Sequence, residues 1–174
     1  MINKKELSVK DITLISIFVV ILFLQEQILS FIPNVSLTFF LLILFSKKLG
    51  FYKTFLIILC HTLLDVFLFN NGLYAYMLFM FIGLMFIPLL LNTLFEKVNS
   101  PIGLALLSIV FSLLYSWINI IPSVVIYNMN LFDYLLFDIV WELILVTSNF
   151  VIVLLLYKPI SKVFDKILYI KMSK

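Results

Sequence analysis

The chain has very few of the residues that build common catalytic and metal sites. It contains one histidine, one cysteine and no arginine, so all twelve of its basic residues are lysines. A single cysteine excludes an internal disulfide framework and a cysteine-based metal site. Cys60 lies within an apolar run, where we expect a small buried hydrophobic side chain.

Charge is also scarce. Charged residues make up 12% of the chain and hydrophobic residues 64%, whereas a soluble domain is about 25% charged and about 45–50% apolar. A core of this size cannot hide that excess, so the composition predicts an all-α membrane protein. We find no linker, repeat or basic patch, which predicts a single domain over residues 1–174, in contact with a lipid bilayer and not with nucleic acid.

Apolar runs separated by turn signals predict six transmembrane helices. Their approximate bounds are 12–32, 35–45, 51–69, 73–94, 102–127 and 131–157, followed by a lysine-rich amphipathic tail over 161–174. The second run is short for a bilayer of about 30 Å, so its helix is tilted, broken or extended by its flanks. Turns are expected at 33–34, 70–72 and 128–130, a kink at Pro88 and an interruption at Pro122.

The lysines predict the orientation of these helices. With six spans, every lysine falls on one side of the membrane, and the three loops on the other side have none. The positive-inside rule then places both termini in the cytoplasm of a multi-pass plasma-membrane protein. Five or seven spans would scatter the lysines over both faces.

Polar residues within the apolar runs gather at one depth, in the half of the membrane away from the lysines. Asp138, Glu142 and Asn149 are spaced i, i+4 and i+11, so they share one face of a helix. Ionisable groups at membrane depth are costly and mark functional sites. The candidate substrate-binding residues are Glu26, His61, Asp65, Tyr74, Trp117, Asn119, Asp138, Trp141, Glu142 and Asn149.

These residues predict a cup that opens outward and is closed inward by an apolar half. The cup offers carboxylates, amides and aromatic rings but no lysine, so it suits a ligand with donors or positive charge and a flat ring. Glu142 is expected to be protonated, paired with His61, or available to a ligand donor.

Structural alternatives stay open for most of these residues. Glu26 and Asp138 could reach water at the interface, and His61 could form a hydrogen-bonded pair with Asp65 one turn away. Asn149 could join two helices, and both tryptophans could be packing or interfacial residues.

Enzyme signatures are missing. The chain has no P-loop, HExxH or GxSxG motif, so we expect neither catalysis nor ATP hydrolysis by this chain, and no cofactor or metal. A cup without an energy source requires partner proteins if it transports its ligand.

The chain resembles the substrate-binding S components of energy-coupling factor (ECF) transporters, which take up vitamins in prokaryotes. The resemblance covers most of the chain in length, span number and topology. Its local segments are 32–38, 48–50, 63–65, 80–83, the series Asp138, Glu142 and 148–150, and 156–159.

The resemblance implies a six-helix fold whose outward cup binds a vitamin or precursor. It also implies docking onto a transmembrane T subunit with two ATPase subunits, and toppling within the membrane to release the substrate. Many members dock through an Ala-xxx-Ala pattern on the first helix. This chain departs from that pattern, and Ser16 and Val20 are the nearest candidates for the docking face.

An alternative is a structural protein of the rod-shape-determining MreD type, which has similar length and hydropathy. Leu64-Asp65 followed by 72–74 resembles that family loosely. Such a protein needs no ligand cup, so ligand binding separates the two hypotheses.

Overall fold

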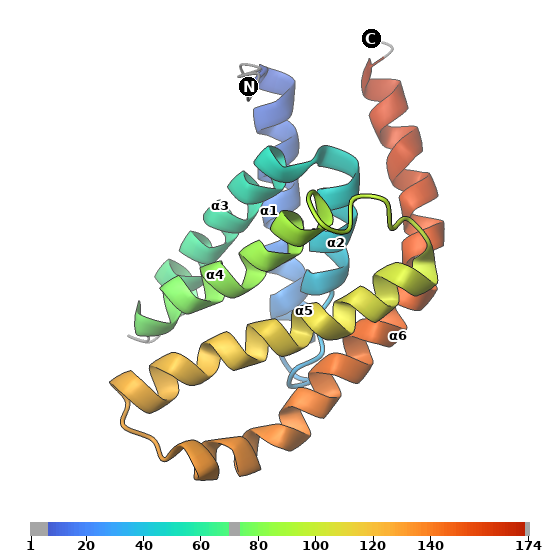
Figure 1. Ribbon diagram of the computed structural model, residues 1–174. Coiled ribbons are helices and arrows are strands. Elements are labelled where there is room, and N and C mark those ends of the chain that lie inside the picture. Colours follow the sequence, from blue (N-terminus) through green and yellow to red (C-terminus); the bar gives the residue numbers. More distant parts are fainter. Residues whose placement is uncertain (1–6, 70–73, 173–174) are drawn as a thin grey trace.

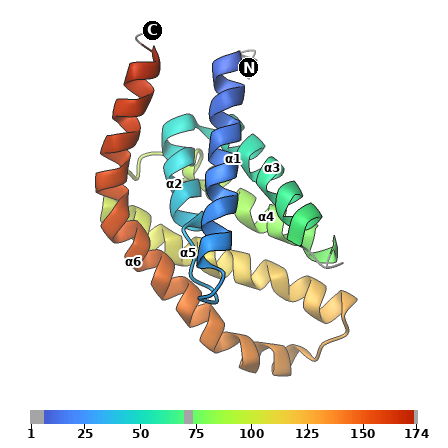
Figure 2. The ribbon, with the colours of Figure 1, turned by 180° about the vertical axis from the view of Figure 1, so that it is seen from behind.

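The structure, a computed structural model, describes residues 7–69 and 74–172, and all regular structure within these ranges is helical. The two described ends of the chain lie at the same end of the bundle (Figures 1 and 2). The helices are α1 (Val9–Leu29), α2 (Thr38–Leu49), α3 (Phe51–Phe69), α4 (Tyr74–Leu91), α5 (Pro101–Ile121), a π-helix (Pro122–Ile126) and α6 (Leu131–Met172).

The bundle is of the membrane-embedded kind. Four helical stretches are long and apolar enough to cross a membrane: α1, α3, α5 with the π-helix, and α6. α4 contributes a shorter apolar stretch, Tyr76–Leu91, and α2 has only 12 residues. Many large apolar side chains lie exposed on the outer surface, which is the arrangement expected of helices that face lipid.

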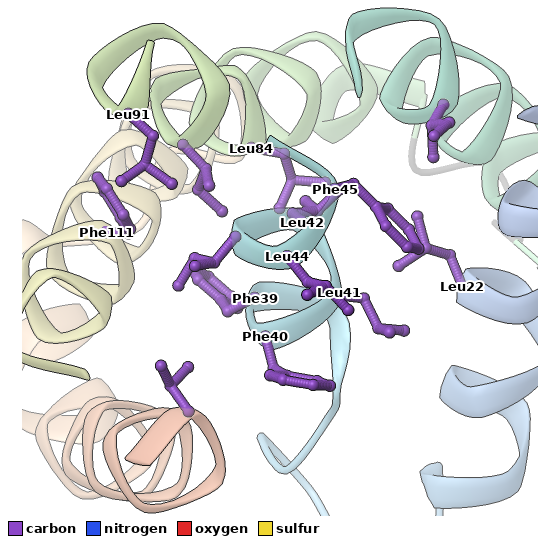
Figure 3. Packing of buried hydrophobic residues seen from close by; sticks show 14 of the residues in the cluster. Leu22, Phe39, Phe40, Leu41, Leu42, Leu44, Phe45, Leu84, Leu91 and Phe111 are labelled. Atoms are coloured by element: carbon purple, nitrogen blue, oxygen red, sulfur yellow. The ribbon is translucent and has the colours of Figure 1, made fainter. Parts of the chain in front are cut away.

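α2 is the centre of the bundle. All nine residues from Thr38 to Ser46 are buried, and the helix contacts α1, α3, α4, α5 and α6. A helix that is buried all round in this way forms the core of the bundle. Figure 3 shows its side chains, among them Leu42 and Phe45, surrounded by residues of the other helices, including Leu22 and Phe111. α2 is shorter than the other helices, with 12 residues, and the loop over 30–37 precedes it.

Local chemistry explains most of the helix boundaries. Ser8 begins α1 with a capping box to Asp11, and Ser100 caps α5. Gly50 separates α2 from α3 at a φ of 79°, where a side chain would be strained. Asn34 and Asn128 also have positive φ, which confirms the predicted turns at 33–34 and 128–130. The predicted turn at 70–72 lies outside the described residues.

Two expectations about single residues are wrong. α6 does not end near Tyr157 but continues through Pro159 to Met172, and it bends along its length (Figure 2). Proline removes one donor and bends a helix without having to end it. Cys60 is exposed on the bundle surface and not buried.

Lysine side chains link neighbouring helices at the end of the bundle where α1 starts and α6 ends. Lys53 Nζ lies 2.7 Å from Asp11 Oδ1, which ties α3 to α1, and Lys48 Nζ lies 2.7 Å from Asp165 Oδ1, which ties α2 to α6. Lys47 donates to two carbonyl oxygens after α4, those of Phe95 and Glu96. Lys47, Lys48 and Lys53 thus tie neighbouring segments together at one end of the bundle.

Candidate functional site

A cavity of about 470 Å³ lies toward the opposite end of the bundle. Its walls come from the end of α3, the start of α4, the end of α5, the start of α6 and the loop over 30–37. We call it the acidic chamber. Its lining residues are Asn34, Asp65, Tyr76, Met80, Tyr115, Ser116, Asn119, Tyr134, Asp138, Glu142 and Leu145.

The helical spacing on α6 brings two of its carboxylates, those of Asp138 and Glu142, to one wall of this chamber. Asp138 Oδ2 accepts a hydrogen bond of 3.2 Å from Ser116 Oγ on α5. Glu142, one turn further along, has an oxygen (Oε1) that is buried and has no hydrogen-bond partner among the described residues. A buried acceptor without a partner costs about 1–3 kcal/mol, so such an atom calls for an explanation.

Asn119 repeats this pattern on α5. Its Nδ2 donates to the Tyr115 carbonyl at 2.8 Å, while its Oδ1 is buried and has no partner within the described part of the chain. Two unpartnered acceptors, Glu142 Oε1 and Asn119 Oδ1, therefore belong to residues that line the same chamber. A bound water or a ligand donor would satisfy both.

The π-helix fixes the aromatic wall of the chamber. Ser123 lies within it, and its Oγ is 2.7 Å from the hydroxyl of Tyr76 on α4. Tyr76 in turn stacks on Tyr127, with ring centroids 5.5 Å apart. One serine thus connects α4 to the π-helix, and π-helical turns of this kind are frequent at functional sites.

A second cavity, of about 260 Å³, adjoins the first beneath the loop over 30–37. We call it the loop chamber. His61 and Glu26 lie in its wall, with His61 Nε2 3.3 Å from Glu26 Oε2. Glu26 also accepts a hydrogen bond of 2.5 Å from Thr38 Oγ1. His61 is 1% exposed, and its Nδ1 has no partner in the described residues.

Gln25 holds the entry to α2 beside this group. Its Oε1 accepts from the Leu37 backbone N–H at 2.7 Å, and its Nε2 donates to Thr38 Oγ1 at 2.7 Å. No side chain caps α2 at Leu37, so this amide from α1 fixes the first turn instead.

Asn34 fastens the loop to α6. Its Nδ2 donates to the Trp141 carbonyl at 3.0 Å, and its own carbonyl accepts from Ser148 Oγ at 3.2 Å. Asn34 lines both chambers, so these two bonds hold the loop over the cavity.

Six of the ten predicted substrate-binding residues line the two chambers. Asp65, Asn119, Asp138 and Glu142 line the acidic chamber, and Glu26 and His61 line the loop chamber. The side chain of Tyr74, at the start of α4, lies outside the described residues.

Three of the predicted site residues do not line either chamber. Trp117 is 55% exposed on the outer surface. Trp141 contributes its carbonyl to Asn34 but no lining side chain. Asn149 is completely buried, and its Nδ2 donates to Ser112 Oγ at 2.9 Å. It therefore joins α6 to α5, which was the structural alternative for this residue.

The structure places His61 beside a residue of another helix. His61 Nε2 lies 3.3 Å from Glu26 Oε2 on α1, and among the described residues no hydrogen bond joins His61 to Asp65 or Glu142. Sequence spacing favoured a partner one turn away on the same helix, but packing of α3 against α1 placed Glu26 closer to the buried Nε2 atom.

Several lining residues were not predicted, and helical spacing would have found three of them. Tyr115 and Ser116 precede Asn119 by four and three positions and so share its face. Trp117 precedes it by two positions and points elsewhere. Tyr134, four positions before Asp138, belongs to the same face of α6 by the same reasoning.

The two docking candidates on α1 lie on its outer surface. Ser16 and Val20 are both exposed, and Ser16 Oγ donates to the Ile12 carbonyl of its own helix at 3.0 Å. The position is therefore accessible to another helix in the membrane.

Gly83 controls the position of Tyr115, which lines both chambers. A Cβ atom at this glycine would lie 2.8 Å from Tyr115 Cδ2. Gly83→Val should therefore push the Tyr115 ring from its place, weaken ligand binding about tenfold or more, and cost about 1–3 kcal/mol in stability. Calorimetric binding and thermal unfolding check this, with Leu78→Val on the exposed face of α4 as control. Unchanged binding by Gly83→Val would contradict the placement of Tyr115.

The two chambers offer acceptor, hydroxyl and aromatic groups to a ligand. Among the described residues, no three His, Cys, Asp or Glu side chains lie close enough together to hold a metal ion. What remains is a pair of chambers with four carboxylates, hydroxyls and aromatic rings, suited to a small organic molecule. No protein-family model, curated protein or solved structure matches the chain.

Proposed function

We propose that the chain is the substrate-binding subunit of an ECF-type uptake transporter. The observation that carries the proposal is the acidic chamber: a cavity in an apolar bundle, with buried acceptors that lack partners in the described residues. In a purely structural bundle the same volume would be filled by apolar side chains. The chamber is within the usual size of small-molecule sites, about 300–1,000 Å³.

The ligand in this proposal is a small, flat vitamin or precursor, neutral or cationic. Thiamine-like pyrimidines, pyridoxal-type rings and queuine-like bases have suitable size and donors. Corrinoids are too large for a cavity of about 470 Å³. Folate and pantothenate carry carboxylates that need a basic clamp, and no lysine lines the chamber.

The proposal includes six membrane crossings with both termini in the cytoplasm. In this arrangement α2 crosses together with the loop over 30–37, and the cup faces outward. Cysteine introduced at Asn130 should react with an impermeant reagent from outside, and cysteine at Lys97 only after permeabilisation. A variant with Cys60 replaced by serine is the background, because Cys60 is exposed. Labelling of Lys97→Cys from outside would contradict the topology.

Uptake requires a T subunit and two ATPase subunits in this proposal, with α1 at the contact. A bulky residue in place of Ser16, Ser16→Trp, should reduce uptake by about tenfold or more and leave ligand affinity unchanged. The physical reason is that close helix packing in membranes depends on small side chains at the contact. Uptake into cells and binding to the purified protein are measured side by side.

The control for this experiment is Leu155→Trp, at an exposed position of α6. Equal loss of uptake and binding in Ser16→Trp would mean that α1 shapes the site instead of the contact. Normal uptake by Ser16→Trp would contradict the contact at α1. Co-purification with cell-shape proteins and no ATPases would overturn the proposal and favour the MreD-like alternative.

A further inference from the structure

The acidic chamber and the loop chamber form one divided site. Four residues line both: Asn34, Met80, Tyr115 and Leu145. The chambers therefore share a wall and adjoin, with the larger one against α6 and the smaller one beneath the loop over 30–37. A ligand that occupies both needs two parts of different chemistry.

The acidic chamber lacks a counter-charge for its carboxylates. Asp65, Asp138 and Glu142 line it, and none of its lining residues is Lys or His. Asp138 receives only a neutral hydroxyl from Ser116, and Glu142 Oε1 has no partner among the described residues. Carboxylates removed from water need a cation or several donors nearby.

A metal ion does not meet this need as well as an organic cation does. The three carboxylates do not form a group tight enough to hold a metal, within the part of the chain that the structure describes. They surround a volume of about 470 Å³ instead. Tyr76, Tyr115 and Tyr134 add aromatic rings to its wall, and aromatic rings attract organic cations.

The loop chamber requires a different group. His61 is buried, its Nε2 faces Glu26, and its Nδ1 is without a partner in the described residues. In the neutral ring this nitrogen accepts a hydrogen bond, and in the charged ring it donates one. A hydroxyl group does either, so it satisfies Nδ1 in both states.

We propose that the site takes an organic cation in two parts: a flat, positively charged ring in the acidic chamber, and a hydroxylated substituent that reaches His61 in the loop chamber. This inference rests on the proposed function, since it concerns the ligand of the same cup. It narrows that ligand from neutral or cationic to cationic, and from a single ring to a ring with a polar extension.

Four related compounds test both parts with the purified protein. Nicotinate, nicotinamide, nicotinamide methylated on the ring nitrogen, and nicotinamide riboside share one ring and differ in charge and extension. We expect the methylated cation to bind about tenfold more tightly than nicotinamide, and nicotinate to bind least. The riboside, which has both a charged ring and hydroxyls, should bind most tightly of the four.

Variants separate the two chambers. Asp138→Asn should remove the preference for charge. His61→Phe should bring the riboside to the affinity of the methylated cation and leave the latter unchanged. Ser36→Leu, in the loop that lines the loop chamber, should have the same effect as His61→Phe and keeps the contact between His61 and Glu26.

Three results would overturn the inference. They are equal binding of nicotinamide and its methylated cation, equal binding of the methylated cation and the riboside, and no binding of any of the four at millimolar concentration. The proposed function is tested separately, by any compound that co-purifies with the protein. A co-purified neutral or anionic compound would leave that function standing while this inference fails.

Discussion

Glu142→Gln should lower the affinity for ligand by about ten- to a hundredfold. The substitution keeps the volume and one acceptor but removes the charge from an oxygen that is buried and unpartnered in the described structure. A hydrogen bond to a charged group contributes about 1.5–3 kcal/mol, which corresponds to the stated loss of affinity. Stability should stay the same or rise, because a buried carboxylate without a basic partner is costly. Isothermal titration with the co-purifying compound measures the affinity.

Asp133→Asn is the matched control for this experiment. Asp133 lies in the first turn of α6, is exposed and does not line either chamber. Removal of the charge at Asp133 should therefore leave the affinity for ligand unchanged. If Glu142→Gln binds normally but unfolds more easily, Glu142 is structural, and the site then moves toward Glu26 and Asp65.

Phe45→Ala should be the most destabilising single change in the core, by about 3 kcal/mol. Phe45 on the central helix is 1% exposed and packs in a cluster with two other phenylalanines. Its ring centroid is 4.5 Å from that of Phe18 on α1 and 6.0 Å from that of Phe164 on α6. In lipid the unfolded helices stay out of water. The loss of stability in Phe45→Ala therefore comes mainly from lost van der Waals contacts and from the cavity left behind.

Thermal unfolding in detergent compares Phe45→Ala with Phe67→Ala, whose side chain is 74% exposed. The exposed variant should keep the melting temperature of the parent protein. Phe45→Leu should lose less stability than Phe45→Ala, because it leaves a smaller cavity. Equal melting temperatures for Phe45→Ala and Phe67→Ala would mean that α2 is not the centre of the core.

Features that depend on a single helix or a single turn could be predicted from the sequence. The run over 51–69 matches α3 at both ends, and proline at position 122 marks the change from α5 to the π-helix. The shared face of Asp138 and Glu142 was also predictable, since it requires only the 3.6-residue period. Both residues line the acidic chamber.

Features that depend on packing between helices could not be predicted from the sequence. His61 lies one turn from Asp65 in sequence, but its contact is Glu26 on another helix. Asn149 continues the face of Glu142, yet it is used to join α6 to α5 through Ser112. The central place of α2 could not be inferred either, because its apolar residues would suit a lipid-facing helix equally well.

The tryptophans illustrate a limit of using residue type alone. Trp117 was selected for its depth in the membrane, although its position two residues before Asn119 turns it to the opposite side of α5. Tyr115, which lines both chambers, was passed over. Helical phase is a better guide here than the chemistry of the side chain.

Mass spectrometry of the protein purified from its native host tests the central claim most directly. The account predicts one small organic compound bound in near-stoichiometric amount, with a flat ring and donors or positive charge. Its amount should fall in Glu142→Gln and stay the same in Asp133→Asn. Protein that carries only lipid in both the parent and the variants would contradict the claim that the cavity between α3, α4, α5 and α6 is a ligand site.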